Sequence, residues 1–144
     1  ASLSKNGLTV GAAETVWDQQ YLQQAKVAPY SGIGPADDGR IKPDLAMDGR
    51  VQLTASGTSD SSYTSAKGTS VATAKISGHL LQLQGYYHSL YGQYMWASTL
   101  KGLTLHTCVD VGSKGPDYKM GWGIMDMVKP AEVIRQEGYS AWIV

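Results

Sequence analysis

The stretch "AKGTSVATAKISGHL", residues 66–80, places a serine at the point where a loop of small residues becomes a helix. A serine at a helix start commonly acts as the N-cap, because its side chain accepts a backbone N–H and stabilises the helix by about 1 kcal/mol. Ser70 also suits a nucleophile, because the free N–H groups and partial positive charge of a helix N-terminus stabilise an oxyanion formed beside them. On these residues alone both interpretations stay open.

A nucleophilic serine needs a base within hydrogen-bond reach, and none of the three histidines fits that role. His79 follows Ser70 by nine residues on the same helix, which is about 13 Å at about 1.5 Å per residue. His88 is farther along the chain, and His106 ends a second helical stretch. We therefore expect all three histidines to be packed or surface residues.

The other reactive side chains favour structural roles. Cys108 is the single cysteine, so it has no internal disulfide partner, and no cysteine–histidine pairing has metal-site spacing. We expect its side chain to be small and buried in a helical stretch. The carboxylates at positions 37, 38, 44 and 48 lack EF-hand spacing, and turn chemistry explains them better. The sequence predicts no metal and no cofactor.

Composition limits the partners of the chain. Its 144 residues, 42% hydrophobic and 17% charged, fit one folded domain with a real core. Twelve basic residues balance twelve acidic ones without a basic run, so nothing predicts nucleic-acid binding. No apolar run approaches the roughly 20 residues of a membrane span, so no membrane partner is predicted either.

Short strands alternate with helical stretches along the chain. Residues 7–12 form an apolar run typical of a buried strand, and residues 50–56 alternate like a short strand. Residues 13–30 have weak helical character and predict a surface excursion, whereas residues 30–44 and 57–68 predict loops. Strands separated by helical crossovers indicate an α/β fold with parallel pairing.

The helix after Gly68 is the clearest element, and we expect it to begin inside the protein. Its apolar residues recur at spacings of three and four, as on one helix face: Ala72, Ile76, Leu80, Leu83, Tyr87 and Leu90. A second helix is predicted over residues 93–107, with Trp96, Leu100 and Leu103 facing inward. A third is predicted to start near Asp126, a suitable N-cap.

Four blocks together resemble the subtilases, the subtilisin-like serine peptidases. "GTSVATAKISG" (68–78) is similar to their serine block, G-T-S-M-A-x-P, and "SGIGPADDGRIKPDLAMDG" (31–49) to their S-S-x-G-P-T-x-D-G-R-x-K-P-D-x-x-A-P-G stretch. "LTVGA" (8–12) and "GPDYKMGWGIMDMVKPAEVI" (115–134) resemble the preceding strand and the closing glycine-rich block. The four blocks occur in the family's order.

The resemblance implies a subtilisin-like parallel sheet with flanking helices and a serine endopeptidase activity on peptides or proteins. Ser70 is then the nucleophile that forms the acyl-enzyme, and its backbone N–H is one oxyanion donor. The resemblance also implies a secreted or cell-surface location.

Three departures from the family pattern keep a second hypothesis open. Ala74 stands where the family has proline, Met47-Asp48 where it has Ala-Pro, and Gly32 where it has serine. The alternative is a non-catalytic binding or structural module with a subtilase-like fold. An unrelated α/β hydrolase is disfavoured, because its nucleophile elbow is G-x-S-x-G and this chain has G-T-S-V-A.

Subtilases carry their triad in the chain order Asp, His, Ser, and this chain begins after the blocks that hold the first two. The resemblance therefore predicts that residues 1–144 form the C-terminal part of a catalytic domain, inactive in isolation. A partial sheet leaves an edge and apolar surface uncovered. We accordingly expect the chain to associate with the upstream part of the same domain, or to form a homo-oligomer.

Overall fold

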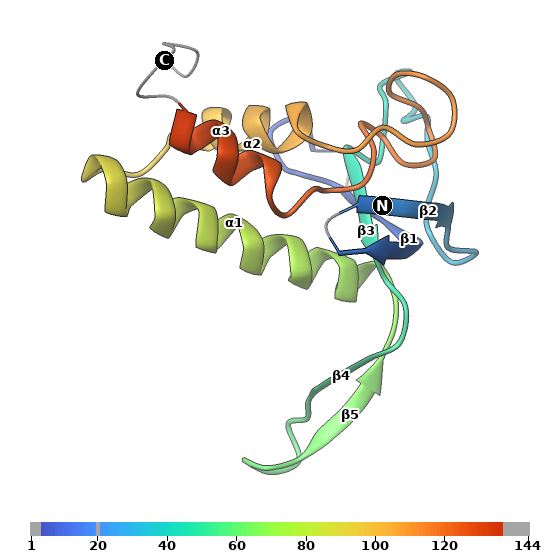
Figure 1. Cartoon of the computed structure of the whole chain (residues 1–144). Helices are drawn as coiled ribbons and strands as arrows, with labels where there is room; N and C mark the ends of the chain where they lie inside the picture. The colour runs from blue at the N-terminus through green and yellow to red at the C-terminus, as the bar shows by residue number, and fades with distance from the viewer. Residues whose placement is uncertain (1–3, 20, 137–144) are drawn as a thin grey trace.

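The computed structural model describes residues 4–19 and 21–136, and Figure 1 shows their arrangement. A small sheet lies against one end of a long helix, two shorter helices lie along that helix, and a two-stranded hairpin projects from the body (Figure 1). The elements are β1 (Val10–Asp18), β2 (Tyr21–Val27), β3 (Leu45–Asp48), β4 (Gln52–Ala55), β5 (Tyr63–Ala66), α1 (Thr69–Tyr91), α2 (Ala97–His106) and α3 (Lys129–Gln136). None of these helices is long and apolar enough to cross a bilayer.

The sheet has the strand order β2-β1-β3. β1 pairs parallel to β3, from Val10 opposite Leu45 to Ala13 opposite Asp48. Strand β3 reaches the buried interior with all four residues covered. The parallel pair and the flanking helices confirm the predicted α/β fold class.

The helical interpretation of residues 13–30 was wrong, because β1 continues to Asp18 and turns back into β2 as an antiparallel hairpin. Gln19, at the turn, has a positive φ of 53°. The alanines and glutamines of this segment are good helix formers, but helix propensity is easily overridden by tertiary contacts, and strand propensity depends on the neighbours that a side chain meets in the sheet. Cross-strand pairing therefore decided the structure here.

The sheet is covered on both faces. Ala12, Leu45 and Met47 belong to one core cluster with Ala72 and Ile76 of α1. The alternate residues Ala13 and Ala46 belong to a second cluster with Met120 and Ile124, since successive side chains of a strand point to opposite faces. The 110–125 segment therefore covers the face that α1 leaves free.

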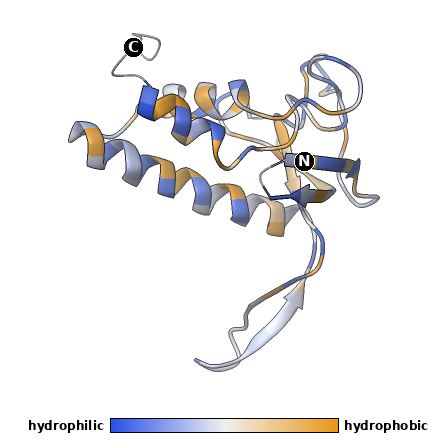
Figure 2. Ribbon diagram, in the orientation of Figure 1, coloured by the Kyte–Doolittle hydropathy of each residue, from blue (hydrophilic) through white to orange (hydrophobic). Residues whose placement is uncertain are grey.

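The predicted apolar face of α1 is largely confirmed. Ala72, Ile76, Leu83 and Tyr87 are buried, and Leu80 packs against the same cluster at partial exposure. Figure 2 shows the apolar positions recurring along the helix. The prediction that Leu90 faces the core was wrong, since this residue lies in the last turn of α1 and is 49% exposed. The helix start is wrong too: Ser70 is exposed, although we expected the helix to begin inside the protein.

The loops before α2 and α3 shift both helices from their predicted starts. α2 begins at Ala97, and Trp96 is 82% exposed. Met95 is buried instead, and the Gln84 amide binds its backbone N–H and carbonyl at 2.9 and 3.0 Å. The Asp126 carboxylate accepts the backbone N–H groups of Val128 and Lys129 at 2.7 and 2.9 Å. Asp126 therefore caps α3 as predicted, although the helix itself starts at Lys129.

His79 is buried in α1, and neither of its ring nitrogens has a hydrogen-bond partner among the described residues. Burial lowers the pKa of His79, because it disfavours the charged ring. The Gln82 side chain and the Asp126 carboxylate partly oppose this shift, although neither completes a well-formed hydrogen bond with the ring. As predicted, this histidine is packed.

Replacing His79 should therefore change how stability depends on pH. In the unfolded chain the histidine takes up a proton as the pH falls through about 6.5, whereas the folded protein resists protonation until a lower pH. The free energy of unfolding should fall on acidification from about pH 7.5 to about pH 5. His79→Leu should reduce this loss, and it should cost less than about 1 kcal/mol at neutral pH because it removes two unsatisfied polar atoms. Urea unfolding at both pH values measures this, with exposed His106→Leu as the control; an unchanged pH dependence in His79→Leu would contradict it.

Cys108 follows α2, and its thiol donates to the Thr104 carbonyl at 3.3 Å. Burial raises the pKa of Cys108 to about 12. Because only the thiolate reacts, Ellman's reagent at about pH 8 should modify this thiol about 1,000-fold more slowly than an ordinary cysteine. Unfolding in guanidinium should restore the normal rate. Rapid stoichiometric modification of the folded protein would show that the thiol is not held protonated.

Candidate active site

Ser70 is the second residue of α1. The helix begins at Thr69, its N-cap is Gly68, and no side chain caps it. The Gly68 carbonyl accepts the backbone N–H groups of Val71 and Ala72 at 3.1 and 3.2 Å, which closes the first turn. The interpretation of Ser70 as the N-cap is therefore wrong.

The hydroxyl and the backbone N–H of Ser70 are the two groups of this residue that could act on a substrate. The residue is exposed, and neither its hydroxyl nor its backbone N–H has a hydrogen-bond partner among the described residues. An N–H in the first turn cannot bond within the helix, and it points along the positive end of the helix dipole. An exposed hydroxyl and an N–H without a partner among the described residues thus stand on one residue.

Two glycines fix where α1 starts relative to the sheet. Gly49, directly after β3, donates to the Ala13 carbonyl at 3.0 Å, and its own carbonyl accepts the N–H of Gly68 at 3.0 Å. The Tyr30 hydroxyl donates to that carbonyl at 2.7 Å. A Cβ on Gly49 would lie 2.8 Å from the Ala12 Cβ and 2.9 Å from the Gly68 carbonyl oxygen. Gly68 has φ 135°, a conformation that side chains rarely adopt. Glycine is therefore required on both sides of this junction.

Charged side chains add a second connection between β3 and α1. The buried Asp48 carboxylate accepts from Arg50 Nε at 2.9 Å and from Lys75 Nζ at 3.3 Å. Burial would raise the pKa of Asp48, but hydrogen bonds from Arg50 and the charge of Lys75 outweigh it and hold the pKa below its usual value. Sequence reasoning assigned Asp48 to a turn and missed this cluster. The available signal was a carboxylate at the end of a buried strand, where the family has proline.

None of the three histidines serves Ser70 as a base. His79 is buried in α1, and His88 is exposed farther along the same helix, where its ring stacks on Tyr94 at 4.5 Å between centroids. His106 is exposed at the end of α2, beside Lys129 of α3. These positions agree with the prediction that all three are packed or surface residues.

Three of the four aspartates between positions 37 and 48, namely Asp38, Asp44 and Asp48, form ion pairs. Asp38 lies 2.7 Å from Arg40, and the buried Asp44 lies 2.7 Å from Lys42. Asp44 also accepts the backbone N–H of Thr9 at 2.6 Å, so this carboxylate holds the start of β1 against β3. Within residues 4–19 and 21–136, no group of histidine, cysteine, aspartate or glutamate side chains could hold a metal ion.

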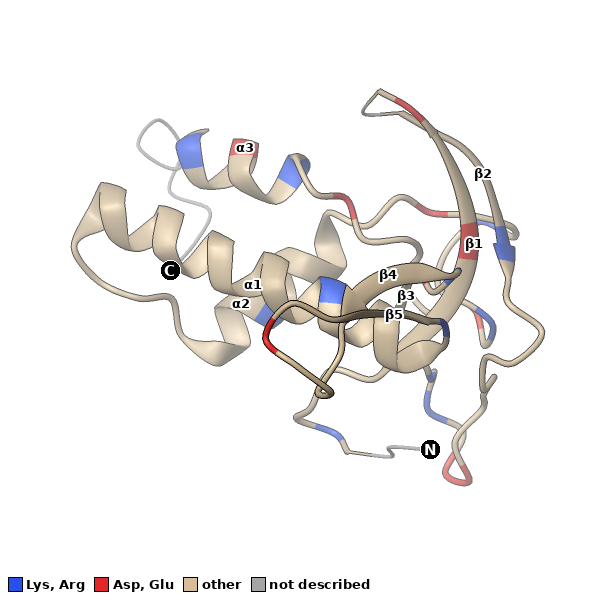
Figure 3. Cartoon of the chain, turned by 90° about the horizontal axis from the view of Figure 1, so that it is seen from below, with Lys and Arg blue, Asp and Glu red and all other residues tan. Residues whose placement is uncertain are grey.

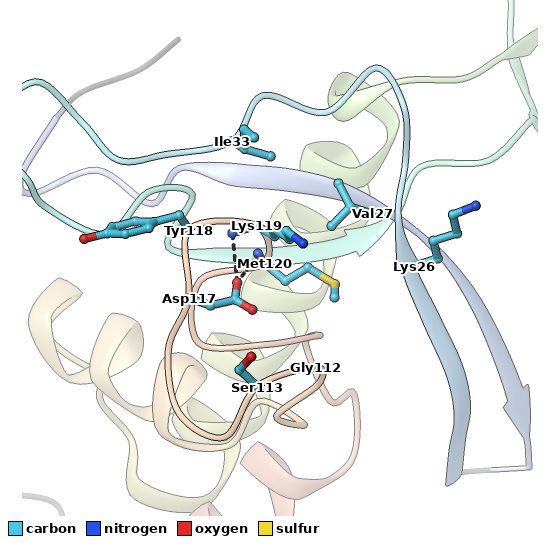
Figure 4. A pocket seen from close by; sticks show the side chains of 9 residues that line it. All are labelled: Lys26, Val27, Ile33, Gly112, Ser113, Asp117, Tyr118, Lys119 and Met120. Atoms are coloured by element: carbon cyan, nitrogen blue, oxygen red, sulfur yellow. Dashed lines mark hydrogen bonds between the residues drawn. The ribbon is translucent and has the colours of Figure 1, made fainter.

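The described residues form several cavities, two of which bear on the location of the site. One of about 740 Å³ lies between β2 and the 112–120 loop (Figure 4), and Ser70 is not among the residues that line it. Its one carboxylate, Asp117, accepts the backbone N–H groups of Lys119 and Met120, both at 2.8 Å, and so serves its own loop. The other, of about 440 Å³, is lined by Lys67, directly before Gly68. Of these two cavities, only the second adjoins the loop that leads into α1 and Ser70.

The comparisons with known proteins agree with this architecture. Among solved structures, the chain is similar to the CspB protease of Clostridium perfringens, with TM-score 0.71 and 19% identity over 89% of this chain. It is also similar to a lanthipeptide protease, with TM-score 0.66 and 17% identity over 88%. Fervidolysin from Fervidobacterium pennivorans, a keratinolytic enzyme related to subtilisin, gives TM-score 0.65 and 18% identity over 88%. At these identities the likeness shows a shared fold.

The chain spans 26% of the CspB protease, 41% of the lanthipeptide protease and 19% of fervidolysin. No curated protein sequence matches it. A sequence model of the subtilase family, however, matches residues 1–123, which include the sheet, the glycine junction and α1. The chain belongs to the subtilase family.

Proposed function

We propose that Ser70 is the nucleophile of a subtilisin-type serine endopeptidase. The observation that carries the proposal is the pairing of an exposed hydroxyl with an unpaired backbone N–H in the first turn of α1. Attack on a peptide carbonyl would place the developing oxyanion beside that N–H and the positive end of the helix. Hydrogen-bond donors fixed in advance at that position often make the largest single contribution to the rate enhancement of acyl transfer.

The base and its orienting carboxylate come, in this proposal, from a part of the domain outside this chain. The histidine would take the Ser70 proton, the aspartate would orient the histidine, and an asparagine would supply the second oxyanion donor. The structural neighbours are proteases whose chains are more than twice as long. Residues 1–144 would thus be the C-terminal part of the catalytic domain, inactive alone and bound either to the remainder or to a second copy.

A non-catalytic subtilase-like module is the second candidate, and one observation favours it. Asp48, where the family has proline, places a charged cluster with Arg50 and Lys75 at the junction that positions Ser70. A module that only binds has no catalytic geometry to preserve, so it could carry such a cluster at this junction. The two candidates differ in whether Ser70 reacts.

Ser70→Ala in the complete protein should abolish peptide hydrolysis while keeping the fold. Because Ser70 is exposed and caps nothing, its loss should cost no more than about 0.5 kcal/mol of stability. The rate should fall by about a millionfold, the scale of nucleophile loss in subtilisin. Casein or chromogenic-peptide turnover measures this, with Ser77→Ala, an exposed serine on the same helix, as the matched control.

A fluorophosphonate probe followed by peptide mass spectrometry identifies the nucleophile directly. The complete protein should carry the adduct on Ser70, and the isolated 144-residue chain should neither turn over substrate nor label appreciably. Labelling of another serine, or none in a folded protein that holds all three triad residues, would refute the assignment and favour the module.

A further inference from the structure

The cavity of about 440 Å³ that Lys67 lines lies where the β4–β5 hairpin joins the body of the protein. Lys67 directly follows β5 and lies three residues before Ser70, so the cavity wall and the first turn of α1 are joined by a short stretch of chain. Figure 3 shows basic positions where the hairpin meets the body. The wall is formed by β1, by the loop after β2, and by the two segments where the hairpin begins and ends. Its residues are Glu14, Tyr30, Arg50, Val51, Gln52 and Lys67.

Most polar groups of this wall are already engaged. The Tyr30 hydroxyl donates to the Gly49 carbonyl at 2.7 Å. The Arg50 guanidinium binds Asp48, with Nε 2.9 Å from Oδ1 and Nη2 3.3 Å from Oδ2. Neither group can turn into the cavity without breaking a contact that holds the junction. They define its shape but do not select a ligand.

Lys67 differs from the engaged side chains of Tyr30 and Arg50. It is exposed, and its ammonium forms no ion pair or hydrogen bond with the described residues. The charges around the cavity are three cations, Arg50, Lys67 and Lys75, against two carboxylates, Glu14 and Asp48. Asp48 binds both Arg50 and Lys75, and the charge of Glu14 acts on Arg50, so these two carboxylates balance these two cations and the remaining positive charge is that of Lys67. A lysine ammonium on its flexible stem can reach a carboxylate in the cavity.

We propose that this cavity receives an acidic side chain of the peptide substrate, close to the scissile bond, and that Lys67 selects it. The inference rests on the proposed function, because Ser70 must act on peptides for the cavity to be a substrate site. It adds the substrate class: sequences with aspartate or glutamate at one position near the cleavage site. Because Lys67 is exposed, the effect should be modest, about threefold for one ion pair, and weaker at high salt.

The test uses the complete protein and pairs of fluorogenic peptides that differ only by glutamate or glutamine at one position around the cleaved bond. The ratio of kcat/KM within each pair is the measurement, so a general loss of activity cancels. At one position the wild type should favour glutamate about threefold. Lys67→Gln should bring this ratio to about one, and Lys67→Glu should bring it below one and favour a lysine peptide at that position. Lys114→Glu, an exposed lysine in the 110–123 loop, should keep the wild-type ratio.

Labelling of Ser70 by a fluorophosphonate is measured first on the same preparations. If Ser70 labels but no position favours glutamate, or if Lys67→Glu keeps the wild-type ratio, the inference about the cavity is overturned and the proposed function stands. If Ser70 does not label in a folded protein that holds the triad, both are overturned. A glutamate preference that Lys67→Gln removes and Lys114→Glu retains supports the inference.

Discussion

The contact between Gly49 and Gly68 is the constraint on which the site depends. It joins the end of the buried strand β3 to the residue before α1 through one backbone hydrogen bond of 3.0 Å. A side chain on Gly49 would overlap the sheet and Gly68, and the φ of 135° at Gly68 suits only glycine. The helix can therefore start at one place only relative to the sheet, and Ser70 is presented at its exposed end.

Charge reinforces this backbone junction. Asp48, adjacent to Gly49, is tied to Lys75 of α1, so β3 and α1 are connected by an ion pair as well as by the hydrogen bond. A buried carboxylate that lost one of its partners would be left poorly compensated, which is why such pairs are costly to break. Asp48, which stands where the family has proline, is thus compensated by its ion pairs with Arg50 and Lys75, and α1 still starts at the same place.

The sequence allowed the fold class and most of α1 to be predicted, because a 3.6-residue apolar period is a local signal. The prediction that residues 57–68 are a loop was wrong for Tyr63–Ala66, which pair with β4 as strand β5. It did not predict the β1–β2 hairpin, because alanine and glutamine carry little strand preference and pairing decides. Trp96 was placed inside, yet the Gln84 amide holds the neighbouring Met95 inward instead. The role of Asp48 could not be predicted either, since Lys75 approaches it from 27 residues away.

The most direct test of the glycine junction is the hydrolytic rate of Gly68→Ala in the complete protein, compared with that of Gly57→Ala. Gly57 lies in the hairpin turn with open space around its Cα and no positive φ, so an alanine there meets nothing. We predict that Gly68→Ala stays folded by circular dichroism but loses at least about 100-fold in kcat/KM, because a displacement of about 1 Å misaligns an attacking group. Gly57→Ala should stay within about twofold of the wild type. A folded Gly68→Ala variant with wild-type kcat/KM would contradict the account.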